Sequence, residues 1–258
     1  MSTERSKRPL AKIMTVAAFH GRFGTQEACA EHLRKVRWGE KLERFVCPDC
    51  GHAKGWWLAK RQLVECTECH RQTSVTAGTV FHRVRSPLWM WFWAMYQLSQ
   101  DKKGVGAIEL AKQVGVCYAT AWLMLHKLRA AMRRRDDARS LKKFAEKRIE
   151  KGSTLKTDGW SAYGPVAAAG YGHHAIVAGS GKEAVEKFPW VHTFISNLKR
   201  MLLGTYHSVS AKHLDRYLAE FSYRANRRWM EDRLFDRLLV ASVSAKPLTR
   251  KQLVTGDR

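Results

Sequence analysis

The apolar residues of this chain recur at the spacing of helices over most of its length, with short alternating runs between them. The first 46 residues are expected to form a helical lead-in, in which Thr25 suits the N-cap of a helix over Gln26–Arg34. The most apolar stretch follows Ser86, another N-cap candidate, and covers Pro87–Gln100. Its 14 residues are too few to span a bilayer, so we expect a buried helix there.

Three tryptophans in that stretch, Trp89, Trp91 and Trp93, allow a second interpretation. Exposed aromatic rings could form a surface that stacks on bases. Phe92 and Met95 fill the other faces of the helix, and a helix that is apolar all round is a buried one. The pattern therefore favours a core helix.

A helix–turn–helix pattern comes next, with a short amphipathic helix over Ala107–Gln113, a turn at Gly115 and a longer helix over Tyr118–Arg135. Any helical hairpin shows similar spacing, but in DNA-binding proteins the first residues of the second helix reach base edges. We expect base contacts from Tyr118 and Thr120. Phosphate contacts are expected from Lys127, Arg129, Arg133 and Arg134.

The last third of the chain predicts a fragment of an α/β layer. Thr154, Leu155 and Thr157 form a short strand that delivers Asp158 to its carboxyl end, where Gly159 lets the chain turn. A carboxylate there can hold a divalent metal, although Asp-Gly is also an ordinary turn pair. Further elements are expected at Ala138–Lys151, His174–Ala178, Lys187–Met201, Ser210–Arg228 and Met230–Val243, before a loose polar tail.

The strong net positive charge of the chain indicates which class of binding partner to expect. Lysine and arginine total 46 against 23 acidic residues, a formal net charge of +23, which favours a polyanion as partner. The basic residues spread along the whole chain, which favours nucleic acid over a membrane surface. The sequence has neither a transmembrane run nor the apolar core of a secretory signal, so we expect a cytoplasmic protein with reduced thiols.

Two cysteine pairs give the strongest local signal. Cys47 and Cys50 are followed by Cys66 and Cys69, with fifteen residues between the two pairs. Four thiolates at this spacing suit a tetrahedral structural zinc site in a zinc ribbon. A pair of disulfides is disfavoured in the cytoplasm, and a redox motif needs no second copy. His52 and His70 flank the pairs and could compete as ligands, whereas Cys29 stands alone and suits a core position.

Several motifs together resemble one family. In order they read CPDC and CTEC, TAGTVFHRVRSPLWMWFWAMY, GVCYATAWLMLHKLRAAMRR, TDGWSAY, and HTFISNLKRMLLGTYHSVSAKHLDRYLAEFSYRANRR. The chain resembles the bacterial insertion-sequence transposases of the IS1595 group, also described as ISXO2-like. The resemblance implies a zinc ribbon, a catalytic domain of ribonuclease-H-like fold, and multimers that bind terminal inverted repeats and act on DNA in the nucleoid.

The resemblance also implies catalytic residues. The family cuts and joins DNA strands with Mg²⁺ or Mn²⁺ held by two aspartates and an Asn, His or Glu. Asp158 in TDGW matches the second aspartate, and Asn197 in HTFISNLK matches the third position. Two metal ions in such a site activate the attacking oxygen and stabilise the leaving one.

The chain departs from the family pattern at the first aspartate. Family members carry a strand with an Asp-Glu pair after the helix–turn–helix, whereas here Arg135 and the pair Asp136 and Asp137 run directly into Ala138. Those two acids suit charge pairing at a basic helix end. We therefore expect an internally deleted, catalytically impaired copy. The alternatives are a non-catalytic zinc-containing DNA-binding protein, a dominant-negative partner of intact transposase, or a chain that does not fold.

The predicted fold class is mainly α with small β. Its parts are a zinc ribbon, a helix–turn–helix-like region and a truncated ribonuclease-H-like α/β domain. The expected boundaries are 1–46 for the lead-in, 47–85 for the ribbon, 86–135 for the helical DNA-binding region, 138–243 for the transposase domain and 244–258 for a flexible tail.

Overall fold

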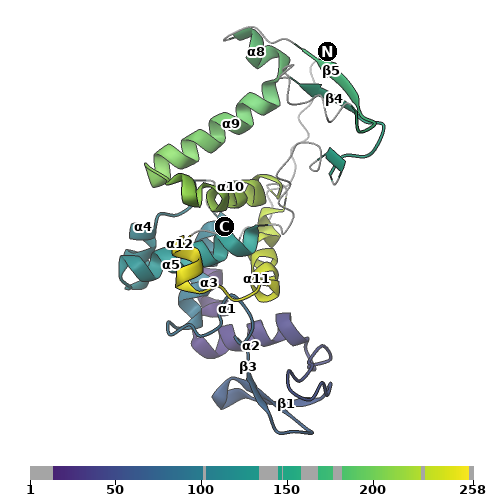
Figure 1. Ribbon diagram of the computed structural model, residues 1–258. Coiled ribbons are helices and arrows are strands. Elements are labelled where there is room, and N and C mark those ends of the chain that lie inside the picture. Colours follow the sequence, from purple (N-terminus) through teal and green to yellow (C-terminus); the bar gives the residue numbers. More distant parts are fainter. Residues whose placement is uncertain are drawn as a thin grey trace. The chain divides into compact units, whose positions relative to one another are not determined.

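The computed structural model is mainly helical with two small sheets, as the sequence predicts (Figure 1). It describes residues 14–100, 103–133, 145–146, 148–157, 168–176, 182–227 and 230–255. The chain divides into two compact units. The first joins Met1–Arg133 with Met201–Arg258, and the second is Arg134–Arg200. The C-terminal helices therefore belong with the N-terminal half, and not with the residues that precede them as the predicted boundary at 138–243 implied.

The first unit begins with two capped helices, α1 (Val16–Phe23) and α2 (Gln26–Trp38). The hydroxyl of Thr25 accepts a hydrogen bond from the amide of Ala28, so the predicted N-cap is confirmed. Helix α2 continues one turn beyond the predicted end. It stops at Gly39, whose φ of +88° is a conformation that favours glycine.

A small antiparallel sheet follows, in the order β1-β2-β3. Its strands are β1 (Gly55–Leu58), β2 (Leu63–Cys66) and β3 (Gln72–Ser74), and η1 (Ala59–Arg61) joins the first two. Trp57 pairs with Val64 and Trp56 pairs with Glu65, so the two tryptophans point to opposite faces.

Helix α3 (Leu88–Gln100) is the buried helix that the apolar run predicts. Trp91 lies in the core, and Trp89 and Trp93 pack against it. The predicted cap is wrong in detail. The hydroxyl of Ser86 accepts from the Trp91 indole, and the first amide of the helix, that of Leu88, donates instead to the Gln26 side chain of α2. A long-range partner has replaced the local one.

Helices α4 (Ala107–Val114) and α5 (Tyr118–Met132) form the expected helix–turn–helix. Gly115 sits between them with φ of +68°, in the left-handed region that this tight turn requires. Helix α5 ends at Met132, because its C-cap Arg133 has an extended backbone (φ −66°, ψ 120°), so the helix stops before the predicted end at Arg135.

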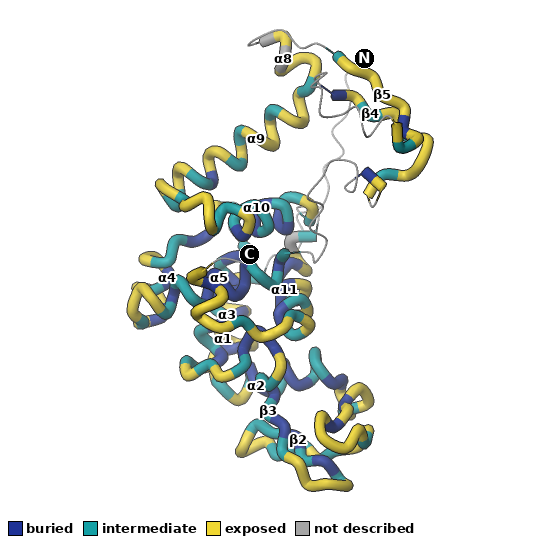
Figure 2. The backbone as a smooth tube through the Cα atoms, viewed as in Figure 1, coloured by how far each residue is buried: buried dark blue, intermediate teal, exposed yellow. Residues whose placement is uncertain are grey.

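The C-terminal helices close the first unit around α5. Helices α10, α11 and α12 pack against α5, and α11 also packs against α2 and α3, where the buried residues gather (Figures 1 and 2). Leu253 of α12 is fully buried, so part of the tail that we expected to be loose is an ordered helix. The elements are η3 (Leu202–Tyr206), α10 (Ala211–Ala225), η4 (Glu231–Arg233), α11 (Leu234–Ser244) and α12 (Arg250–Thr255).

The second unit contains a two-stranded parallel sheet, β4 (Thr154–Thr157) and β5 (Gly172–Ala175). The second strand starts two residues earlier than predicted. A small apolar cluster centred on Ala145 and Tyr171 packs by this sheet. Two helices follow, α8 (Lys182–Lys187) and α9 (Pro189–Met201). None of the described helices combines the length and apolar character needed to cross a membrane.

His126 of α5 is buried, and among the described residues no acidic side chain pairs with it. Its ring stacks on Trp122 with centroids 4.0 Å apart, and its Nε2 lies 3.4 Å from the Tyr217 hydroxyl of α10. Burial, and then the positive charges of Arg129 and Arg216, lower the pKa of His126 from 6.5 to about 2. His213 of α10 also adds to this lowering. The folded protein therefore holds His126 neutral.

Acid should destabilise the protein through His126. The unfolded state binds one more proton than the folded state between about pH 6.5 and about pH 2. The neutral ring makes its full contribution to the free energy of unfolding above about pH 6.5. As the pH decreases below this value, the contribution is lost by up to about 1.4 kcal/mol per pH unit. We expect His126→Gln to flatten the pH dependence of urea unfolding. The exposed His20→Gln is the control, and an equal slope in both variants would contradict the assignment.

Candidate functional site

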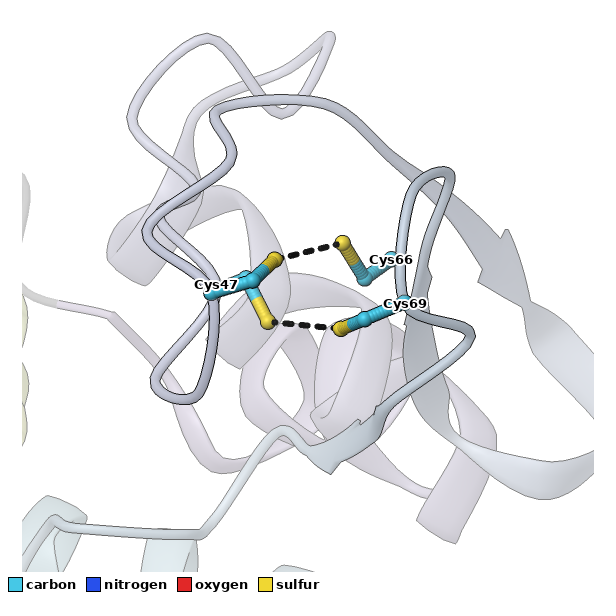
Figure 3. Close-up of side chains that lie close together, drawn as sticks. Cys47, Cys66 and Cys69 are labelled. Carbon is cyan, nitrogen blue, oxygen red and sulfur yellow. Dashed lines mark hydrogen bonds between the residues drawn. The ribbon is translucent and has the colours of Figure 1, made fainter.

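The four predicted cysteine ligands come together at one end of the ribbon sheet. All four Sγ atoms lie within 4.8 Å of one another, with Cys47 to Cys69 at 3.5 Å and Cys50 to Cys66 at 3.6 Å (Figure 3). A tetrahedral site with Zn–S bonds of about 2.3 Å has S–S edges of roughly 3.8 Å. The sulfur positions therefore fit a structural zinc ion.

Both cysteine pairs adopt the same backbone turn. The amide of Gly51 donates to the Cys47 carbonyl, and the amide of His70 donates to the Cys66 carbonyl. Gly51 and His70 both have positive φ, at 74° and 57°. The amide of Cys50 lowers the pKa of the Cys47 thiol to about 7, whereas hydrogen bonds among the thiols raise the pKa of Cys50 and of Cys69 in the metal-free cluster. These matching turns pre-arrange the ligands.

The flanking histidines are outside the cluster. His70 is largely exposed, and its Nδ1 lies 3.5 Å from a carboxylate oxygen of Glu65. Among the described residues, the four cysteines alone form a group of three or more side chains close enough to hold a metal. Four thiolates complete a structural site, so neither His52 nor His70 is required as a ligand.

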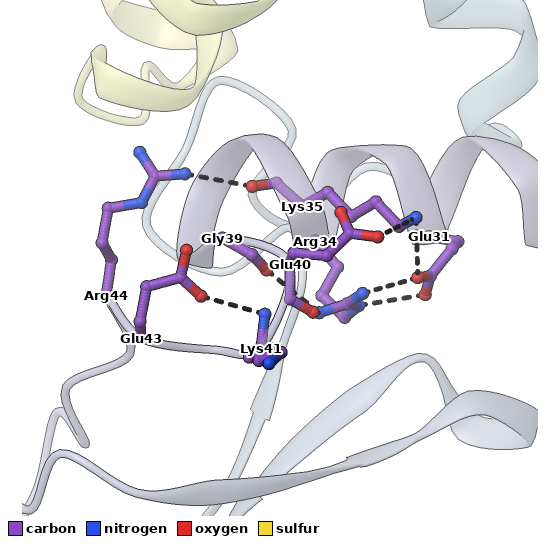
Figure 4. A network of polar contacts seen from close by, with 8 residues as sticks. All are labelled: Glu31, Arg34, Lys35, Gly39, Glu40, Lys41, Glu43 and Arg44. Carbon is purple, nitrogen blue, oxygen red and sulfur yellow. Dashed lines mark hydrogen bonds and ion pairs between the residues drawn. The ribbon is translucent and has the colours of Figure 1, made fainter.

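A polar network fixes the chain between α2 and the first cysteine pair (Figure 4). Arg34 is buried and donates two hydrogen bonds to the carboxylate of Glu31. It also donates to the carbonyls of Gly39 and Glu40. Gly39 has φ of +88°, a backbone conformation that is strained for any residue with a side chain, so glycine is favoured there. The network fixes the C-terminal end of α2 and the chain that follows it, just before the ribbon.

Removing zinc should unfold the ribbon, because this small sheet has little core of its own. We expect about one zinc per chain in the intact protein and none in Cys66→Ser, with a lower melting temperature. Elemental analysis and circular dichroism with and without chelator measure both. Cys117→Ser, at an exposed cysteine outside the cluster, is the control. Equal melting of the metal-free and metal-loaded chain would contradict a structural role.

The predicted base-contacting residues lie at the start of α5. Tyr118 is 55% exposed, and Thr120 is half-buried with its hydroxyl 3.2 Å from the Sγ of Cys117. At the other end of α5, Arg133 lies 3.9 Å from a carboxylate oxygen of Asp215, and Arg134 lies outside the described residues. Tyr118 is thus the most accessible of these side chains.

Two predicted phosphate contacts, Lys127 and Arg129, lie in the interior. Lys127 is 6% exposed and donates to the carbonyl of Val80. Arg129 is 1% exposed and its Nε donates to Glu220 at 2.6 Å. Burial acts to lower the pKa of Arg129, but the Glu220 carboxylate outweighs it and raises the pKa. We therefore withdraw both residues from the phosphate-contact set.

Sequence reasoning missed Glu220, the partner that holds Arg129 inside. Glu220 is fully buried and also lies 3.0 Å from Arg224 and 3.1 Å from the Tyr206 hydroxyl. One feature of the sequence could have indicated the burial of Lys127 and Arg129. Helix α5 is apolar on nearly all its faces, so it has no polar stripe on which these two side chains could face solvent.

Glu220→Gln should be strongly destabilising because it leaves the buried Arg129 charge without a carboxylate. Breaking one side of a buried pair costs about 3–5 kcal/mol. Denaturant unfolding measures the loss. Glu109→Gln, at an exposed acid of α4, should change stability by about 0.5 kcal/mol or less. A similarly small effect at position 220 would show that the pair contributes little.

The two predicted catalytic residues are only partly described. Asp158 is the residue after β4 and lies outside the described residues, as do Asp136 and Asp137. Asn197 is exposed on α9. Both Asp158 and Asn197 belong to the second unit, apart from the ribbon and the helix–turn–helix. The described residues alone do not assemble a catalytic metal centre.

The zinc ribbon and the helical unit around α5 are those of a zinc-ribbon transposase. The chain matches the ISXO2-like transposase domain over residues 98–226, half of its length, and the transposase zinc-ribbon domain over residues 24–72. It therefore belongs to the IS1595 family of ISXO2-like transposases. Comparisons with curated proteins and with solved structures gave no match.

The matched ranges follow the packing of the first unit. The zinc-ribbon match starts before α2, and Arg37 of α2 donates to the carbonyls of Ser74 and Val75 in the ribbon. The transposase-domain match starts within α3 and extends through α10. It therefore includes the helix–turn–helix, which we had predicted as a region separate from the transposase domain.

Proposed function

We propose that this chain binds the ends of an insertion sequence and is a catalytically impaired transposase. Its family membership, carried by the match over residues 98–226, implies DNA transposition. The net charge of +23 supports a nucleic-acid partner. Transposition requires two ends to be held together, and we propose that a homo-oligomer does this.

The proposed DNA-reading element is the start of α5. Tyr118 and Thr120 stand in its first turn, after the glycine turn that separates α4 from α5. The exposure of Tyr118 supports its contact with base edges in the major groove. Arg133 and Arg134, at the end of the same helix, are proposed to contact phosphates. Lys127 and Arg129 instead hold the helix in place.

The proposed catalytic residues are Asp158 and Asn197, with Mg²⁺ or Mn²⁺ as the metal. When bound, such ions activate the attacking oxygen and stabilise the leaving one. Asp158 offers a hard anionic oxygen at the end of β4, and Asn197 a neutral carbonyl oxygen. The sequence supplies no aspartate that matches the first family position, which leaves the site one carboxylate short. We infer an internal deletion as its origin.

A second candidate function is inhibition of intact transposase copies. The ribbon and the helix–turn–helix share one compact unit, whereas Asp158 and Asn197 lie in the other. Damage to the catalytic segment can therefore leave the DNA-binding unit folded. Such a chain would occupy element ends without cutting them.

Two assays test these proposals. We expect the chain to shift DNA that carries the inverted-repeat ends of its own element, and Tyr118→Ala to weaken this binding about tenfold. Strand cleavage with Mg²⁺ or Mn²⁺ should be no greater than that of Asp158→Ala. Robust cutting that Asp158→Ala abolishes would refute the impairment. No shift at low salt would refute the binding of element ends, and a shift without sequence preference would indicate phosphate contacts alone.

A further inference from the structure

The zinc-ribbon sheet carries two consecutive tryptophans with opposite roles. Trp57 faces the inner side, where the guanidinium of Arg34 lies 5.8 Å from its ring and its cross-strand partner Val64 is fully buried. Trp56 faces the outer side and is 68% exposed. In the described part of the chain, the indole of Trp56 makes no hydrogen bond and no ring contact, although its backbone pairs with Glu65 in the sheet. Trp57 serves the fold, whereas Trp56 is available to a partner.

The outer face around Trp56 combines apolar and polar residues. We call this surface the outer face and define it by Trp56, Leu58, Leu63, Glu65 and Gln72, which the strand register places on one side. Glu65 is engaged within the sheet, since Gln72 donates to its carboxylate at 2.7 Å. Leu58 and Leu63 are half-buried and flank the indole. The face offers a flat aromatic platform.

Basic residues flank Trp56 along the chain, while the one acid of the outer face, Glu65, is engaged by Gln72. Residues 51–64 contain Lys54, Lys60 and Arg61 and no acidic residue. All three basic side chains belong to exposed residues, on β1's leading loop or on η1. Charge complementarity therefore favours a polyanion as the partner of this surface.

The outer face is also held rigidly. Cys66 ends β2, so the metal cluster anchors one end of the sheet. On the inner side, Arg37 of α2 donates to the carbonyls of Ser74 and Val75. Gln26, also on α2, donates to Gln62 in the hairpin between β1 and β2. A pre-arranged platform loses little conformational freedom when it binds.

We propose that the outer face binds single-stranded DNA, with Trp56 stacking on an unpaired base and Lys54, Lys60 and Arg61 contacting the flanking phosphates. Duplex DNA buries its base faces within the stack, whereas an unpaired base exposes a face to an aromatic ring. The inference rests on the proposed binding of element ends. It adds a second site to that function, because α5 would read duplex and the ribbon would hold a separated strand.

Fluorescence anisotropy with the zinc-loaded full chain tests this site. The probes are a labelled single-stranded oligothymidylate and a labelled duplex with the inverted-repeat sequence. Trp56→Ala should weaken binding of the single strand about tenfold or more and leave duplex binding within about twofold. Trp56→Phe should restore most of the single-strand affinity because a phenyl ring also stacks. Lys60→Ala with Arg61→Ala should weaken single-strand binding and lower its salt dependence.

The controls separate this proposal from the one before it. Trp190→Ala removes a tryptophan that is 74% exposed on α9 and should leave single-strand binding unchanged. Unchanged single-strand affinity in Trp56→Ala would overturn the proposed site even if duplex binding persists. So would absence of single-strand binding by the unmodified chain. Weaker duplex binding by Tyr118→Ala with intact single-strand binding would support both sites. If the unmodified chain binds the single strand but not the duplex, only the proposed function would be contradicted.

Discussion

The buried ion pair between Arg129 and Glu220 is the interaction on which the first unit depends. The two residues are 91 positions apart, on α5 and α10, and neither side chain is more than 1% exposed. Arg224 and Tyr206 also contact the carboxylate of Glu220. Gly104 lacks a side chain, and a Cβ there would collide with Tyr206 and Glu220. A charge buried this deeply is tolerated only with its partner in place, so α5 and α10 must fold together.

This pairing explains why the chain divides as it does. The residues between the partners include the whole second unit, which carries β4, α9 and both proposed catalytic residues. Helices α10, α11 and α12 pack against α5, and α11 also packs against α3 and α2. Arg37 of α2 in turn donates to the carbonyls of Ser74 and Val75 in the ribbon. The zinc ribbon, the helix–turn–helix and the C-terminal helices thus belong to one compact unit, and the second unit is inserted into it along the chain.

The sequence predicted the local features of this fold well. The spacing of the four cysteines, the Thr25 cap and the Gly115 turn each depend on neighbours along the chain, and the structure has all three. Features set by distant contacts were not predictable. No residue close to Arg129 in the sequence indicates that Glu220 is its partner. Likewise, no residue close to Leu88 in the sequence indicates that the Gln26 side chain accepts from its amide. The charges of Lys127 and Arg129 on α5 indicated phosphate contacts, but both side chains are buried in the structure. The catalytic residues remain predictions.

Hydrogen exchange on the zinc-loaded full chain tests the shared unit most directly. If α5 and α10 form one cooperative body, their slowest amides should exchange with the same free energy of opening. Glu220→Gln should then lower the protection of both helices equally. Protection lost in α10 and α11 alone, with α5 unchanged, would contradict the account.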